Sequence, residues 1–126
     1  MREIPILYLV VPCYNEEEVV EKTAAVMGEK LTRLEREDKI AKGSKVMFVN
    51  DGSKDKTLQL LHGIAGKDRR FSVVSLAGNY GHQSAILAGM MTARKYADVV
   101  VTIDADLQQD IEALDAFLQC YMEGCE

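Results

Sequence analysis

Four short segments of the chain are rich in apolar, β-prone residues. They are Ile6–Val11, Val46–Val49, Phe71–Leu76 and Val99–Ile103, and polar or turn-forming residues follow each of them. In most of these segments apolar residues follow one another without alternation, which is typical of strands covered on both faces of a sheet. The pattern therefore predicts four buried strands, with Pro12 ending the first.

Between and after the strands, apolar residues recur three or four positions apart, which is the spacing of one face of an α-helix. The first of these stretches predicts a long helix from about Glu16 to about Asp38, with Asn15 as its N-cap and acidic residues in its first turn. Three further helices are predicted over Thr57–Ala65, around Ile86–Ala97, and from Ile111 to the end of the chain.

Short connections join these elements in the order strand, helix, strand, helix. About four such βα units predict an α/β fold with three layers, in which helices cover both faces of a mainly parallel sheet. The length of 126 residues and the 48% hydrophobic content suit a single domain over residues 1–126 with its own core.

The composition limits which kinds of partner and which cellular compartment we expect. The net charge is −5 and the 15 basic residues are scattered, which argues against a nucleic-acid partner. Cys13, Cys120 and Cys125 lack metal-type spacing and the chain shows no secretory signal, so we expect reduced thiols in a cytoplasmic protein. The apolar opening Ile4–Val11 is too short to span a bilayer.

An unusual polar cluster follows each predicted strand. The clusters are Pro12–Glu16, Asn50–Ser53, Gly78–Gly81 and Asp104–Asp106. In open parallel sheets, ligands bind beyond the carboxyl ends of the strands, which lie at one edge. The sequence therefore predicts a single ligand site to which all four clusters contribute.

Two of the clusters offer groups that can recognise a nucleobase. The Asp51 carboxylate and the Asn50 amide oxygen can each accept a hydrogen bond from a base N–H, and Tyr14 can stack on the base or flank it. Glu16 fits equally well as a first-turn helix acid or as a ligand contact. The polar groups that follow Asp51 are interpreted as turn and capping groups, and His82 as a surface or capping residue.

The fourth cluster places two carboxylates at the end of an apolar strand. Ionised carboxylates at such a place favour a cation or another partner, and Mg²⁺ or Mn²⁺ carrying substrate phosphates suits oxygen ligands of this kind. Asp106 is then expected to coordinate the metal directly, with Asp104 in an outer or ribose contact. The alternative for this segment alone is a solvated turn with two surface acids.

Several motifs together carry a family resemblance. The segments Val11–Glu17, Val49–Thr57 and Asp104–Asp106 resemble the nucleotide-binding half of a family 2 glycosyltransferase with the Rossmann-like GT-A fold. Asn79–Ala85 and Asp106–Gln108 are similar to members that charge polyprenyl phosphates, the dolichyl-phosphate mannose synthase and undecaprenyl-phosphate glucosyltransferase group.

The resemblance implies an inverting transferase that uses a UDP- or GDP-sugar and a divalent metal, Mg²⁺ or Mn²⁺. Its acceptor would be a lipid phosphate, polyprenyl phosphate above all, or a glycan. Asp106 and Asp104 would hold the metal. The nucleotide-binding residues that it implies are Pro12, Tyr14, Glu16, Asn50, Asp51, Asn79 and Asp104.

The chain departs from the family pattern in three ways. Gly78 stands where the subgroup has an arginine, and Asn50 replaces the first aspartate of the commoner Asp-Asp-Gly-Ser form. The family's acceptor site, catalytic base and membrane-associated helices would lie beyond Glu126. We therefore expect a domain truncated on its C-terminal side, which can bind a donor without transferring it. An exposed sheet edge could then allow homo-oligomers, and the full-length protein could associate with the cytoplasmic face of a membrane.

Three alternatives remain beside this reading. A signalling receiver domain has a similar length and an acidic pocket, but it requires a fifth βα unit and paired acids after the first strand. A metal-dependent nucleic-acid module would use Glu16 with Asp104 and Asp106, although a basic groove is missing. A non-catalytic nucleotide-binding fragment is the third.

Overall fold

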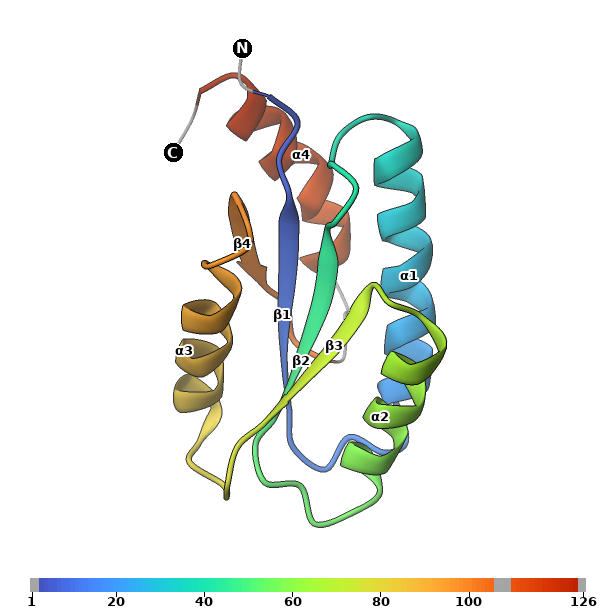
Figure 1. The fold of residues 1–126 in the computed structure, drawn as a ribbon, viewed down its shortest axis with the longest axis vertical. Coiled ribbons are helices and arrows are strands. Elements are labelled where there is room, and N and C mark those ends of the chain that lie inside the picture. The colour runs from blue at the N-terminus through green and yellow to red at the C-terminus, as the bar shows by residue number, and fades with distance from the viewer. Residues whose placement is uncertain (1–2, 106–109, 125–126) are drawn as a thin grey trace.

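The computed structural model describes residues 3–105 and 110–124. Four strands and four helices alternate along this part of the chain: β1 (Leu7–Cys13), α1 (Val20–Arg36), β2 (Lys45–Asn50), α2 (Thr57–Lys67), β3 (Phe71–Ser75), α3 (His82–Ala93), β4 (Val99–Thr102) and α4 (Asp110–Met122). The strands form one parallel sheet in the order β3-β2-β1-β4 (Figure 1). The predicted α/β fold with four βα units is confirmed.

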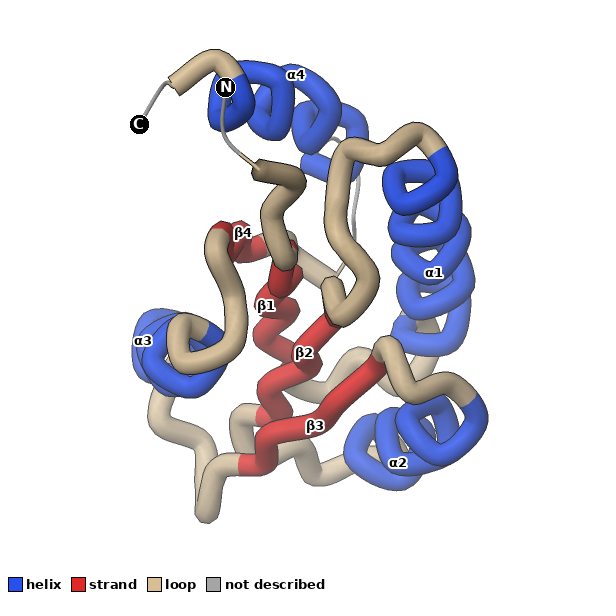
Figure 2. Tube along the Cα trace, turned by 45° about the horizontal axis from the view of Figure 1, so that its top comes forward, coloured by secondary structure: helices blue, strands red, loops and turns tan. Residues whose placement is uncertain are grey.

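Helices cover both faces of the sheet, as the unbroken apolar strands predict. Side chains of β1 alternate between the faces, since Leu7, Leu9 and Val11 pack with α1, α2 and α4, whereas Tyr8 and Val10 pack with α3. Figure 2 shows α3 on one side of the strands and α1 and α2 on the other. None of the described helices is both long and apolar enough to cross a membrane.

Strand β1 continues through Pro12 to Cys13, so the prediction that Pro12 ends it is wrong. Strand β4 pairs with β1 only as far as Val10, whose carbonyl accepts the Ile103 N–H, while the Cys13 carbonyl accepts the Asp51 N–H on the β2 side. Backbone groups alternate between the two neighbours of a strand. The position of the missing Pro12 N–H therefore faces the β4 side beyond the paired residues, where a proline removes no ladder hydrogen bond.

Helix α1 begins at Val20, several residues later than predicted. Asn15 is not its N-cap: it adopts a left-handed conformation with φ of 52°, which asparagine tolerates better than most residues. Its side chain instead accepts the Lys54 N–H at 2.8 Å. Glu16 consequently lies before the helix in the loop after β1 rather than in the first helical turn.

A cluster of ion pairs ties α4 to α1. The Asp115 carboxylate accepts from Lys30 at 2.7 Å, from Arg33 at 2.9 Å and from Lys39 at 2.9 Å. Hydrogen bonding from Lys30, followed by that from Lys39 and Arg33, holds the pKa of the Asp115 carboxyl well below its usual range. The cluster therefore depends on the ionised form of Asp115.

The cysteines depart from the prediction of three reduced thiols. Cys13 is a free, buried thiol, but Cys120 is disulfide-bonded, so the prediction is wrong for Cys120. Cys125 lies outside the described residues. Burial, with the nearby Glu16 carboxylate as the smaller cause, raises the pKa of the Cys13 thiol to about 12. Cys13 is therefore a neutral thiol at physiological pH and a poor nucleophile.

Candidate functional site

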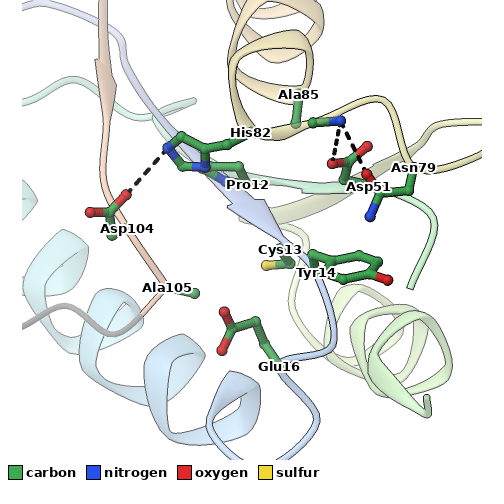
Figure 3. Close-up of a pocket in the computed structure, with 11 residues that line it drawn as sticks. Pro12, Cys13, Tyr14, Glu16, Asp51, Asn79, His82, Ala85, Asp104 and Ala105 are labelled. Carbon is green, nitrogen blue, oxygen red and sulfur yellow. Dashed lines mark hydrogen bonds and ion pairs between the residues drawn. The ribbon is translucent and has the colours of Figure 1, made fainter. Parts of the chain in front are cut away.

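A pocket of about 450 Å³ lies at the carboxyl ends of β1, β2 and β4, beside the start of α3. Residues from all four polar clusters or their immediate neighbours line it (Figure 3): Pro12, Cys13, Tyr14, Glu16, Asp51, Asn79, Gly81, His82, Ala85, Asp104 and Ala105. Six of the seven predicted nucleotide-binding residues are among them, and Asn50 is not. This is the edge of the sheet at which parallel α/β folds bind ligands.

The loop after β1 is held by side chains from the loop after β2 and from the first residue of α2. The Asn15 N–H donates to Ser53 Oγ at 3.0 Å and the Glu16 N–H donates to Thr57 Oγ1 at 2.8 Å. Tyr14, which is 39% exposed, and Glu16 are thereby presented to the pocket. The sequence indicates only turn and capping roles for Ser53 and Thr57, because nothing in it pairs them with partners about forty positions away.

Asp51 is buried at the inner end of the pocket and organises the loop before α3. Its carboxylate accepts the Tyr80 N–H at 2.8 Å and the Gly81 N–H at 3.0 Å, as Figure 3 shows in part. The adjacent Gly52 has φ of 69°, and a Cβ there would lie 2.5 Å from the Asn79 backbone nitrogen. The loops after β2 and β3 are therefore packed directly on each other. That Asp51 also accepts a nucleobase N–H stays a prediction.

Asn50 and Asn79 differ in what their side chains do. Asn50 is 2% exposed, donates through Nδ2 to Ser75 Oγ at 3.2 Å and accepts the Ser53 N–H at 3.3 Å. Its amide thus joins β2 to β3 and to the following turn. Asn79 is exposed, lines the pocket and accepts the Gly81 N–H at 3.2 Å. Ligand contacts by these two residues stay predictions.

Asp104 reaches the pocket from the end of β4. The segment is fixed on both sides, since the Ile103 N–H donates to the Val10 carbonyl and Thr23 Oγ1 donates to the Ala105 carbonyl. Ala105 is buried in the core, whereas the Asp104 side chain is 64% exposed. Asp106, the predicted direct metal ligand, lies outside the described residues.

The pocket combines acidic, aromatic and imidazole groups. Glu16, Asp51 and Asp104 contribute carboxylates, and His82 Nε2 lies 3.7 Å from Asp104 Oδ1 (Figure 3). Across the part of the chain that the structure describes, no three His, Cys, Asp or Glu residues gather as a metal-binding group. Chemically, the arrangement can accept hydrogen bonds from a polar ligand, flank a ring with Tyr14 and attract a cation to Asp104.

Comparison with known proteins identifies the family. The model of the glycosyl transferase family 2 matches residues 8–124. The chain is 45% identical over 122 residues to the uncharacterized glycosyltransferase YkoT of Bacillus subtilis, covering 97% of this chain and 36% of that protein. It is 36% identical over 121 residues to an undecaprenyl-phosphate 4-deoxy-4-formamido-L-arabinose transferase of Pectobacterium atrosepticum, covering 92% of this chain and 33% of that protein. The chain thus spans about a third of the length of these relatives.

Solved structures share the fold. A mannosyltransferase of Pyrobaculum calidifontis, PcManGT, solved in complex with GDP-Man and Mn²⁺, superposes with a TM-score of 0.67 at 24% identity, covering 92% of this chain and 32% of that one. This superposition shows that nearly the whole described chain has the fold of the mannosyltransferase, a GT-A fold. The match to the family model excludes the receiver domain and the nucleic-acid module as alternatives. The chain belongs to glycosyl transferase family 2.

Proposed function

We propose that residues 1–126 form a domain that binds the nucleoside-diphosphate sugar donor of an inverting glycosyltransferase. The observation that carries the proposal is the pocket itself, which gathers Tyr14, Asp51 and Asp104 from the ends of three parallel strands. A donor of this class needs a planar base site and a diphosphate site separated by a ribose. The pocket offers the Tyr14 ring and the Asp51 carboxylate at one side and the Asp104 carboxylate at the other (Figure 3).

At the base side, the base of UDP or GDP would lie against Pro12 and Tyr14. Tyr14 is only partly buried, so its ring can flank an incoming base without displacing core residues. Asp51 and Asn79 would supply polar contacts beside it, while Glu16 faces the space between the base and Asp104. Asn50 would contribute without contacting the base, because its side chain supports the turn that follows Asp51.

At the other side, Asp104 and Asp106 would hold Mg²⁺ or Mn²⁺. The donor chemistry fits, because these hard cations take carboxylate oxygens and the Asp104 carboxylate is exposed rather than committed to the core. When bound, such an ion offsets negative charge on the leaving diphosphate. The related PcManGT structure contains GDP-Man and Mn²⁺, which supports the same pairing here.

The complete protein would transfer the sugar to a lipid phosphate, polyprenyl phosphate above all, with a glycan as the other acceptor class. The undecaprenyl-phosphate transferase among the relatives supports this assignment. The reaction would be a single displacement with inversion, at the cytoplasmic face of a membrane. None of the described residues is assigned as the catalytic base.

A transfer assay tests this function. The full-length protein is incubated with radiolabelled UDP- and GDP-sugars, Mn²⁺ and undecaprenyl phosphate, and label entering the lipid phase is counted. We expect metal-dependent transfer from one nucleotide class, a product of inverted anomeric configuration, and loss of transfer in Asp104→Ala. Nucleotide binding without transfer to any acceptor would favour the non-catalytic nucleotide-binding alternative.

A further inference from the structure

We propose that the His82 imidazole donates a hydrogen bond to the diphosphate of the bound nucleotide. The inference rests on the proposed function, because it assigns a contact in the same pocket. From the sequence, His82 is interpreted as a surface or capping residue. The structure instead places its side chain among the groups that line the pocket.

The charge of the pocket favours such a donor. Glu16, Asp51 and Asp104 surround the space with carboxylates, which repel a diphosphate. Among the described lining residues, His82 is the one whose side chain can carry a positive charge. An imidazole retains at least one N–H donor in its neutral form, so the contact does not depend on protonation.

The backbone around His82 is fixed at the right place. Asp51 holds the N–H groups of Tyr80 and Gly81, and Gly81, with φ of 100°, turns the chain into α3 so that His82 opens the helix. The first backbone hydrogen bond of α3 runs from the Ala85 N–H to the Gly81 carbonyl. His82 therefore lies at the N-terminus of the helix, which is the end that favours anions such as a diphosphate.

The imidazole lies on the diphosphate side of the pocket. Figure 3 shows the ring beside Asp104, across from Tyr14 and Asn79, where the base would lie. Diphosphate oxygens coordinated to a cation at Asp104 would therefore come within reach of His82. His82 and Asp104 would then contact the same part of the ligand from neighbouring positions on one side of the pocket.

The His82 side chain is not needed for the packing of the fold. His82 has a side chain that is 59% exposed, and its Nε2 lies 3.7 Å from Asp104 Oδ1, which is beyond hydrogen-bond distance. A structural role in packing is therefore a poor explanation of its place. Replacing it is expected to leave the fold intact, which makes its role in binding measurable.

Nucleotide titrations with matched variants test the proposal. UDP, GDP, uridine and guanosine are titrated with Mn²⁺ into the wild type, His82→Ala, His82→Lys and the control His62→Ala, whose exposed histidine lies on α2. His82→Ala should weaken binding of the nucleoside diphosphate about tenfold and leave nucleoside binding unchanged. His82→Lys, which keeps a donor, should restore most of the affinity, and His62→Ala should bind as the wild type does.

A spectroscopic measurement supplies an independent readout. The chain has two histidines, so two sets of imidazole proton resonances can be assigned with the two alanine variants. The nucleoside diphosphate should shift the His82 resonances well beyond any shift caused by the nucleoside, while those of His62 stay in place.

The outcomes separate this inference from the function on which it rests. If the wild type binds the diphosphate and His82→Ala binds it equally well, the His82 contact is refuted and donor binding stands. An equal loss of nucleoside and nucleotide affinity would also refute it, because that loss reports a damaged pocket. If the wild type binds no nucleotide, the proposed function fails and the His82 contact fails with it.

Discussion

At the scale of single residues, Asp51 links the chemistry of the pocket to its construction. Its two hydrogen bonds to the backbone of the loop before α3 fix Tyr80 and Gly81, and so fix where His82 begins the helix. A carboxylate oxygen can accept more than one hydrogen bond, so Asp51 can still accept a hydrogen bond from a ligand while it holds these two backbone groups. Asp51 can thus organise the site and still contact a base.

Asp51→Asn should destabilise the protein by about 1–3 kcal/mol, because the amide would present an N–H group to a backbone N–H in a buried place. Urea denaturation measures the change in the free energy of unfolding. Asp104→Asn is the matched control in the same pocket, and since its side chain is exposed we expect a change within about 0.5 kcal/mol. Equal stability of the two variants would contradict the role given to Asp51.

Most of the pocket could be predicted from the sequence, because ligands bind beyond the carboxyl ends of parallel strands. Tyr14, Asp51 and Asp104 stand out because each follows an apolar run at an edge where ligands collect. The roles of Ser53 and Thr57 could not be predicted in this way, because their partners lie in a loop about forty positions earlier. A hydroxyl in a turn carries no sequence signal for the backbone group that it will meet.

At the scale of elements, the packing of α3 on the sheet depends on one missing side chain. A Cβ at Gly89 would lie 2.4 Å from Val10 Cγ1 and 2.8 Å from Val49 Cγ2, so the helix and the sheet are in close contact at this glycine. The helix can approach β1 and β2 only because that space is empty.

Gly89→Ala should destabilise the protein by about 1–3 kcal/mol, since the added methyl overpacks the contact. Gly63→Ala on α2 is the matched control, because nothing lies within 4 Å of the position of its Cβ. It should stabilise the protein by about 0.5–1 kcal/mol through helix propensity alone. Thermal unfolding followed by circular dichroism gives both values, and the same sign for both variants would contradict this account.

The limits of prediction at this scale concern the ends of elements. Periodicity located all four helices, but it extended α1 back to Glu16, because an asparagine followed by three glutamates is a common helix start. The hydrogen bonds of Asn15 with Ser53 and Lys54 favour an irregular loop there. Tertiary contacts from a distant segment thus overrode a local signal.

The attachment of α4 should depend on pH. The pKa of Asp115 is lowered in the folded protein, so its stabilisation is present above the unfolded pKa of about 4 and is lost as the pH falls toward the folded value. The difference in the free energy of unfolding between the wild type and Asp115→Asn should therefore be constant at pH 6–7 and shrink below about pH 4. Urea denaturation at several pH values measures it. Asp38→Asn, an exposed position that forms none of these ion pairs, should show no such trend.

At the scale of the whole molecule, the described sheet has β4 as one of its two edges. Phe117 of α4, which is 47% exposed, lies in a shallow apolar pocket together with residues of β4. An edge strand beside exposed apolar surface favours pairing with another chain. This is the basis for the predicted homo-oligomer.

Sedimentation velocity over a range of protein concentrations tests the oligomer. We expect the sedimentation coefficient of the 126-residue chain to rise with concentration, and Phe117→Asp to reduce that rise. Leu87→Asp, at an exposed apolar position on α3, is the control and should leave it unchanged. Association that is lost in Leu87→Asp and kept in Phe117→Asp would assign the interface to the other face.

Donor binding is the central claim, and calorimetry tests it most directly. UDP and GDP are titrated separately into the protein with Mn²⁺ and again with a chelator, and then into Asp104→Ala and Asp106→Ala. The account predicts saturable binding of one nucleotide at one site per chain, weakened by the chelator and by each substitution. Saturable binding of neither nucleotide in the presence of Mn²⁺ would contradict the donor site, and binding that survives Asp106→Ala unchanged would contradict the metal role.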